Sequence, residues 1–286
     1  IGGDSGVAGN GADVAVQATG NIDTFGIAAY GILAQSIGGG GGIAGNIDRE
    51  IGEAGINLAF GRGGGNGGNG GHVSVTTAGT IATRATGACG IFAQSIGGGG
   101  GLAGDIGPGI GFAGSVGGDG AAGEIAVAHT GAITTYGDNA HGIFAQSAAG
   151  DVGASVRVIL NGDIQALGAD ASGIVAQSIG GSASGDITID VLGGTVRGGA
   201  AAGAGIAIRD GAANTIANAG TVTTAGGLNG TAILAGVGNE TVDNMGMVIG
   251  TVDLGVGANA FNNRADGVFN AGAMVALGAG NTFANE

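Results

Sequence analysis

One segment recurs along the chain, and it constrains the fold more than any other feature. Two copies are DVAVQATGNIDTFGIAAYGILAQSIGGGGG, from Asp13, and HVSVTTAGTIATRATGACGIFAQSIGGGGG, from His72. Self-similarity of this kind is typical of repeat proteins, in which each copy is one structural unit stacked on the next. Further copies begin at Glu124, Arg157, Ile187 and Asn214.

Each copy contains three short apolar pieces, V-x-V, I-x-T and G-I-x-A-Q-S, separated by turn residues. Gly20 and Gly31 are 11 residues apart, and so are Gly79 and Gly90. Apolar residues in alternation, bounded by glycine, indicate strands. Three short strands in every repeat predict an all-β chain that folds as a right-handed parallel β-helix, with about eight rungs stacked roughly 4.8 Å apart.

The spacing between copies is not constant. Gly142 and Gly173 are 31 residues apart, whereas Gly31 and Gly90 are 59 apart. The excess follows the AQS motif, in glycine-rich arms at about 37–71 and 96–123. We expect the arms to fold over the β-helix as an outer layer, because glycine allows backbones to approach closely; flexible loops are the alternative. We expect one continuous solenoid, with armed rungs over 1–235 and shorter armless rungs over 236–286.

The third strand has two different faces. Side chains alternate across a strand, so Ile32 and Ala34 share one face while Leu33 and Gln35 share the other. A weaker copy places Arg209 at the glutamine position, and arginine is rarely buried, so this face should point outward. We predict an outer apolar stripe of Leu33, Phe92, Phe144 and Val175. We also predict a ladder of bonded amides from Gln35, Gln94, Gln146 and Gln177.

Few residues suggest chemistry. Cys89 and His141 occupy the same repeat position and could form a nucleophile pair, but variation there favours a surface column. His129 has no partner that the repeat predicts. We therefore expect no catalytic residues and no cofactor. Calcium stays open as an alternative, because GGNGGNGGHVSV and GGDGAAGEIAV partly match a calcium-binding repeat, although Gly71 and Gly123 stand near the expected aspartate.

Composition excludes several classes of protein. Glycine accounts for 73 of the 286 residues, but there is 1 proline and no period of three, which excludes collagen. The net charge of −14 and the absence of lysine argue against nucleic acid as a partner. A mean hydropathy of +0.41 argues against a disordered chain. One cysteine allows no internal disulfide. Because the chain starts and stops within its motifs, we expect a fragment of a longer chain.

The motif GIxAQSIGGGGG, together with VDLGVGANAFNNRADGVFNAGAMVALGAGNTFANE near the end, resembles the passenger region of large bacterial autotransporters, the type V secretion family. The resemblance implies a secreted β-helix at the bacterial cell surface, anchored to the outer membrane before release. It also implies an outer-membrane β-barrel translocator on the parent chain as a partner. Since the family contains adhesins, proteases and esterases, the resemblance leaves activity open.

These observations favour a non-enzymatic, extracellular structural protein that acts as an adhesin stalk or filament. Its partners would be other copies of itself or surface and host ligands. The alternative is the rigid stem of a secreted enzyme whose catalytic domain lies elsewhere on the parent chain.

Overall fold

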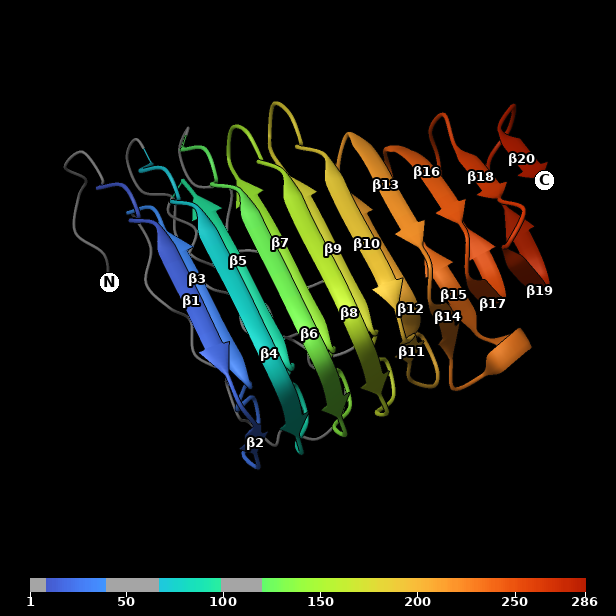
Figure 1. Cartoon of the computed structure of the whole chain (residues 1–286). Helices are drawn as coiled ribbons and strands as arrows, with labels where there is room; N and C mark the ends of the chain where they lie inside the picture. Colours follow the sequence, from blue (N-terminus) through green and yellow to red (C-terminus); the bar gives the residue numbers. More distant parts are fainter. Residues whose placement is uncertain (1–8, 40–66, 99–119) are drawn as a thin grey trace, which may run out of the picture.

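The chain forms a parallel β-solenoid in a computed structural model that describes residues 9–39, 67–98 and 120–286. Its 20 described strands belong to one continuous sheet, and every strand pairing between rungs is parallel. The strands stack along a rod, with β1 and β20 near its opposite ends (Figure 1). The predicted fold class, a parallel β-helix of short strands, is confirmed.

The first part of the solenoid contains five rungs. The first rung comprises β1 (Val14–Thr19), β2 (Ile22–Thr24) and β3 (Ile32–Ile37). The next three are β4 (Val73–Thr83) with β5 (Ile91–Gly97), β6 (Ile125–Thr135) with β7 (Ile143–Ala149), and β8 (Val156–Ala166) with β9 (Ile174–Ile179). The fifth comprises β10 (Ile187–Gly193), β11 (Thr195–Gly198) and β12 (Ala204–Asp210).

The second part continues the same sheet. Its first rung comprises β13 (Ala213–Asn218), β14 (Thr221–Thr224), the 3₁₀ turn η1 (Gly227–Asn229) and β15 (Thr231–Leu234). Shorter rungs follow, with β16 (Asn239–Asn244) and β17 (Met247–Asp253), then β18 (Ala260–Asn263) and β19 (Val268–Ala276), and finally β20 (Thr282–Asn285). These rungs are shorter because β17 pairs with both β14 and β15, so one strand replaces two.

The prediction of three separate strands per rung is wrong for the rungs of β4, β6 and β8. In these rungs the first two apolar pieces form one strand, which bends at a glycine. Gly79 has φ +124° and Gly131 has φ +127°, values that L-residues rarely adopt. A Cβ on Gly131 would also lie 2.1 Å from the carbonyl oxygen of Gly79 in the rung below. Glycine therefore turns the chain without interrupting the hydrogen-bond ladder.

The insertions leave the register intact. Val14 pairs with Val73 although the first arm lies between them, and Val73 pairs with Ile125 across the second. The glycines at the base of each arm pack backbone against backbone. A Cβ on Gly38 would lie 1.9 Å from the carbonyl oxygen of Gly68. Most of each arm lies outside the described residues, and so does the predicted outer layer.

The core fills the inside of the rungs with stacked columns of isoleucine and valine. One column contains Ile81, Ile133 and Ile164, which are at most 3% exposed. Gly90 is required beside this column, because a Cβ there would lie 2.4 Å from Cγ2 of Ile133. Burying each isoleucine stabilises the fold by roughly 1.5–3 kcal/mol. Stacked β-branched side chains therefore make up most of the core cluster.

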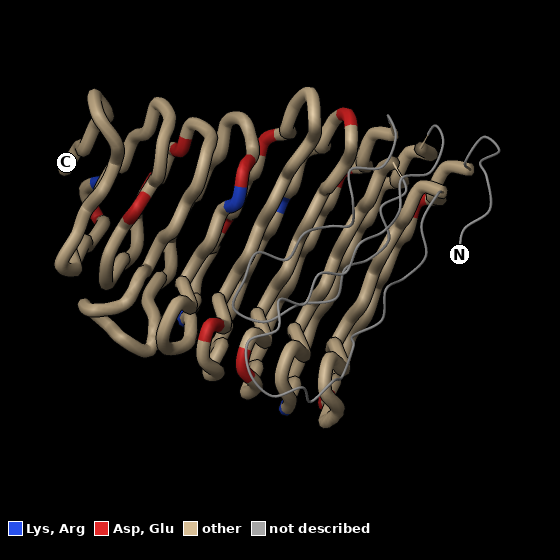
Figure 2. The backbone as a smooth tube through the Cα atoms, turned by 180° about the vertical axis from the view of Figure 1, so that it is seen from behind, with Lys and Arg blue, Asp and Glu red and all other residues tan. Residues whose placement is uncertain are grey.

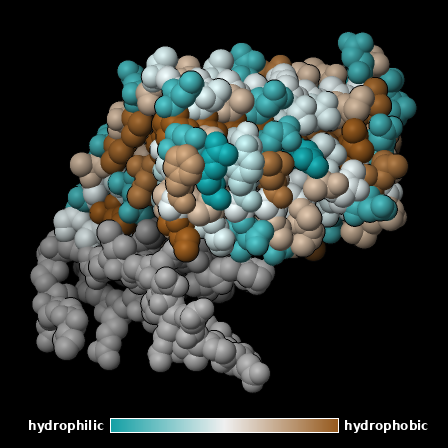
Figure 3. All heavy atoms as spheres, turned by 90° about the horizontal axis from the view of Figure 1, so that it is seen from below, coloured by the Kyte–Doolittle hydropathy of each residue, from teal (hydrophilic) through white to brown (hydrophobic). Residues whose placement is uncertain are grey.

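Charged side chains are sparse along the rod (Figure 2). Seen from below, the described surface mixes apolar and hydrophilic side chains (Figure 3). Phe25 and Ile27, for example, are 72% and 71% exposed. Among the described residues, no helix is long and apolar enough to cross a membrane.

Candidate functional site

The outward face of β3, β5, β7 and β9 carries every predicted site residue. The four strands pair without a register shift, so each residue of the GIxAQS motif lies beside its counterpart in the next rung. The isoleucine and alanine of the motif belong to the core cluster, whereas the alternate residues do not. The pleat of the strands therefore separates the motif into an inner and an outer set.

The glutamines form a hydrogen-bonded ladder. Gln35 Nε2 donates to Gln94 Oε1, and Gln94 Nε2 donates to Gln146 Oε1. Gln146 Nε2 donates to Gln177 Oε1 at 2.7 Å. Gln177 Nε2 then donates to Asp210 Oδ2 at 2.9 Å, an acceptor that the repeat pattern did not indicate. Gln94 and Gln146 are each only 2% exposed, so the ladder satisfies polar groups that water does not reach.

The apolar stripe lies beside this ladder. The ring of Phe92 lies 5.0 Å from that of Tyr30 and 4.8 Å from that of Phe144, centroid to centroid. Val175 packs against Phe144 in a small cluster separate from the main core. The stripe is unevenly covered, because Leu33 is 49% exposed whereas Phe92 and Val175 are 8% and 0% exposed.

The serines of the motif point inward and join successive rungs. Ser95 Oγ donates to the carbonyl of Gly71 at 2.8 Å and accepts a hydrogen bond from the N–H of Gly123 at 2.8 Å. Ser147 repeats this arrangement with Gly123 and Ala154. Each hydroxyl thus links the start of its own rung to the start of the next, which is a structural role.

The prediction that Cys89 and His141 form a surface column is wrong. Cys89 is 3% exposed and His141 is 8% exposed. Burial, together with the nearby charge of Arg209, lowers the pKa of His141 to about 4. His141 Nδ1 accepts a hydrogen bond from the N–H of Ser172 at 3.0 Å. The neutral ring therefore carries its proton on Nε2, and its lone pair is already engaged. Such a ring is poorly placed to activate a thiol.

A second buried histidine has a partner that the sequence did not reveal. His129 Nδ1 and Thr77 Oγ1 lie 2.8 Å apart inside the solenoid, on the paired strands β6 and β4. Burial lowers the pKa of His129, and its Nε2 has no partner among the described residues. The sequence contained one signal for this contact: Thr77 and His129 occupy the same position in successive copies of the repeat.

Asparagines form a comparable ladder in the shorter rungs. Asn218 Nδ2 donates to Asn244 Oδ1 at 2.8 Å, Asn244 Nδ2 to Asn263 Oδ1 at 2.7 Å, and Asn263 Nδ2 to Asn285 Oδ1 at 2.7 Å. These residues end β13, β16, β18 and β20, where the chain turns. Asparagine suits such corners because its short amide bonds both to its own kind and to nearby backbone.

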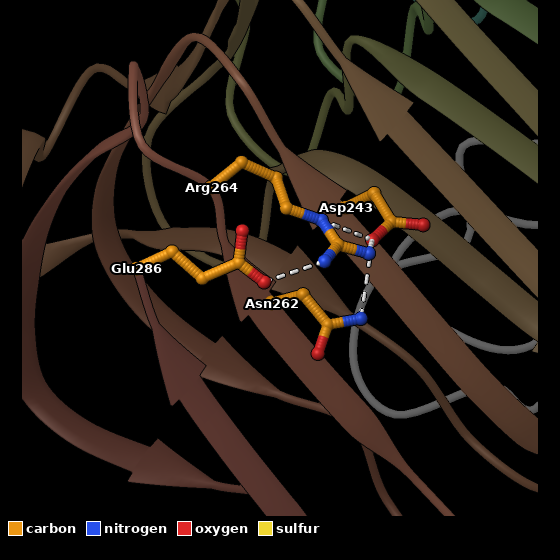
Figure 4. A network of polar contacts seen from close by, with 4 residues as sticks. All are labelled: Asp243, Asn262, Arg264 and Glu286. Carbon is orange, nitrogen blue, oxygen red and sulfur yellow. Dashed lines mark hydrogen bonds and ion pairs between the residues drawn. The ribbon is translucent and has the colours of Figure 1, made fainter.

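A polar network lies on the outside of the same rungs (Figure 4). Arg264 Nη1 donates to Glu286 Oε1 at 2.7 Å, and Arg264 Nε donates to Asp243 Oδ1 at 3.0 Å. Asn262 Nδ2 also donates to Asp243 Oδ1, at 3.1 Å. Ion pairs as exposed as these contribute little stability. The network links neighbouring rungs in the same way as the ladders.

In the part of the chain that the structure describes, no group of three or more histidine, cysteine, aspartate or glutamate side chains is placed to hold a metal ion. Comparisons with protein families, with curated proteins and with solved structures found no match to this chain. The candidate site therefore consists of amides that form hydrogen bonds along the rod and of aromatic and aliphatic side chains that pack beside them.

Proposed function

We propose that this chain is a non-enzymatic structural rod of the bacterial cell surface, the passenger of an autotransporter, which acts as an adhesin stalk or filament. One observation carries the proposal: polar side chains that recur in the repeat form hydrogen bonds from one rung to the next, over many rungs. Glutamines, serines and asparagines each continue a ladder along the rod. A stalk requires such continuity, because its task is to span a distance without bending or unfolding.

Two further features support the proposal. The chain has 21 acidic and 7 basic residues, so an acidic surface would keep copies soluble and apart. With one cysteine, its rigidity comes from backbone and side-chain ladders rather than from disulfides. The assignment to autotransporters rests on the GIxAQSIGGGGG motif and on the armless repeats that follow it.

The test removes one rung from the parent chain. Deletion of residues 143–173 joins Gly142 to Ile174 and removes β7 and β8, so that β6 would pair with β10 and β11 as β8 now does. A stalk should fold without this rung, label with antibody on intact cells, and still support attachment. A matched control deletes residues 143–158, which joins the chain out of register and should prevent folding. Loss of attachment in the correctly folded deletion would instead place a binding or catalytic site in that rung. Absence of label on intact cells would refute a surface location.

A further inference from the structure

A column of polar side chains runs along the inner corner of the last rungs. Asn214 pairs with Glu240 across β13 and β16. Asn259 precedes β18 and Asn281 precedes β20, and the register of those strands places both residues in the same column. The column therefore consists of three amides and one carboxyl group.

The amides of this column all donate to backbone carbonyl groups. Asn214 Nδ2 donates to the carbonyl of Asp210 at 3.0 Å, and Asn259 Nδ2 donates to that of Leu254 at 3.0 Å. Asn281 Nδ2 donates to the carbonyl of Gly257 at 2.9 Å. An ionised carboxylate has no proton with which to make such a bond, whereas a protonated acid has one.

Glu240 is placed as an amide would be. It is 1% exposed; its Oε1 accepts a hydrogen bond from Asn214 Nδ2 at 2.8 Å, and its N–H donates to Asn259 Oδ1 at 2.9 Å. Its Oε2 is buried and has no partner among the described residues. Burial raises the pKa of Glu240, against the opposing effect of the bonds from Asn214 and its own backbone.

No counter-charge offsets the carboxylate in the described structure. Arg209 on β12 is not among the groups that influence the pKa of Glu240, and the other charged groups on the surrounding elements have partners of their own. On β12, Asp210 accepts from Gln177; on β16, Asp243 accepts from Arg264, which follows β18; and at the end of β17, Asp253 accepts from the N–H of Gly255. β13 carries no charged side chain. An ionised Glu240 would be a buried charge held by one amide.

We propose that Glu240 is a proton-controlled lock between the rungs of β13, β16 and β18. The protonated acid completes the polar column and tightens these rungs. The ionised form leaves a buried charge in the corner and loosens them. Glu240 would thus hold these three rungs together more firmly in mildly acidic surroundings than in neutral ones, and this contribution is opposite in sign to that of the buried His141.

The direction of the pH effect follows from proton linkage. A carboxyl group whose pKa is raised on folding favours the folded state while it is protonated. Its contribution is therefore complete below its ordinary value of 4.5 and is lost as the pH rises through the folded pKa. Removing the carboxyl group should remove this part of the pH dependence.

The experiment compares Glu240→Gln with Glu124→Gln, an exposed glutamate immediately before β6 that serves as the matched control. Urea unfolding constants are measured from about pH 4 to about pH 8, the range over which a raised carboxyl titrates. Near neutral pH, the unfolding equilibrium constant of Glu240→Gln should be about fivefold to a hundredfold smaller than that of wild type. This is the effect expected when one unsatisfied buried group is removed. Near pH 4 the difference should vanish.

An unchanged pH profile in Glu240→Gln, or equal effects of the two variants, would overturn the proposal. Should Glu240→Gln fail to fold, carbon-13 NMR of the side-chain carboxyl groups in the wild-type chain decides. A Glu240 carboxyl that titrates at higher pH than that of Glu124 supports the lock. One that titrates together with Glu124 refutes it.

Discussion

Replacing Gln94 with leucine tests whether the outward ladder holds rungs together. Gln94 both accepts from Gln35 and donates to Gln146, so leucine removes two hydrogen bonds at once. The Oε1 of Gln146, on a side chain 2% exposed, would lose its partner, which costs about 1–3 kcal/mol. Gln35 is less buried, so water replaces part of its lost bond. Leucine recovers some of the cost by burying apolar surface.

The expected net loss of stability is about 1–3 kcal/mol, or roughly 2 °C in Tm for each kcal/mol in a chain of this size. Urea unfolding followed by circular dichroism measures it. Gln17→Leu, on the exposed outer face of β1, is the control and should change stability by less than about 0.5 kcal/mol.

A double variant sharpens the test. Replacing Gln94 and Gln146 together removes both members of the buried bond, so the acceptor on Gln146 is no longer left unsatisfied. The double variant should therefore cost less than the sum of the two single variants. A loss of only a few tenths of a kcal/mol in Gln94→Leu would show that water hydrates these amides, and the reasoning would be wrong.

Two further predictions concern the core. Because the pKa of His141 falls to about 4 on folding, from an ordinary value of 6.5, the contribution of His141 to stability should be full above pH 6.5 and should fall by on the order of 3 kcal/mol near pH 4. His141→Asn should show a shallower fall in acid titrations, and an identical slope would contradict the assignment. Gly90→Ala should cost at least about 3 kcal/mol or prevent folding, since its Cβ would meet Ile133. Gly87→Ala, at φ +66° in open space, should cost only about 1 kcal/mol in the same urea assay; equal losses would mean that close packing is not the reason for Gly90.

The sequence was sufficient for the fold because its period carries the information. Identical residues at identical spacing must lie side by side once the rungs stack, so the partners of Gln94 followed directly from the repeat. The same logic assigned the outward face from Arg209 alone. It could not show that Gly79 bends a strand rather than ending it, since bend and turn use the same residue.

The repeat also did not indicate burial at positions where the residue varies between copies. Cys89 and His141 share a position with Tyr30 and Ser172, and that variety suggested exposure although the site is buried. In the structure, Glu240 lies in a column of asparagines. Its rung is shorter than the earlier rungs, so the spacing of the repeat in the sequence did not align Glu240 with Asn214. Burial at these positions depends on neighbours that periodicity does not specify.

The direction of the backbone hydrogen bonds has a mechanical consequence. These bonds run along the rod, from each rung to the next, and β1 and β20 lie near opposite ends of the rod (Figure 1). Tension applied to both ends would therefore peel rungs off one at a time rather than shear a whole sheet at once. A rung such as Gly142 to Gly173, 31 residues apart, occupies about 4.8 Å of rod but extends to roughly 100 Å when released. Under load, this molecule would lengthen in steps and dissipate a pull that would break a stiffer tether.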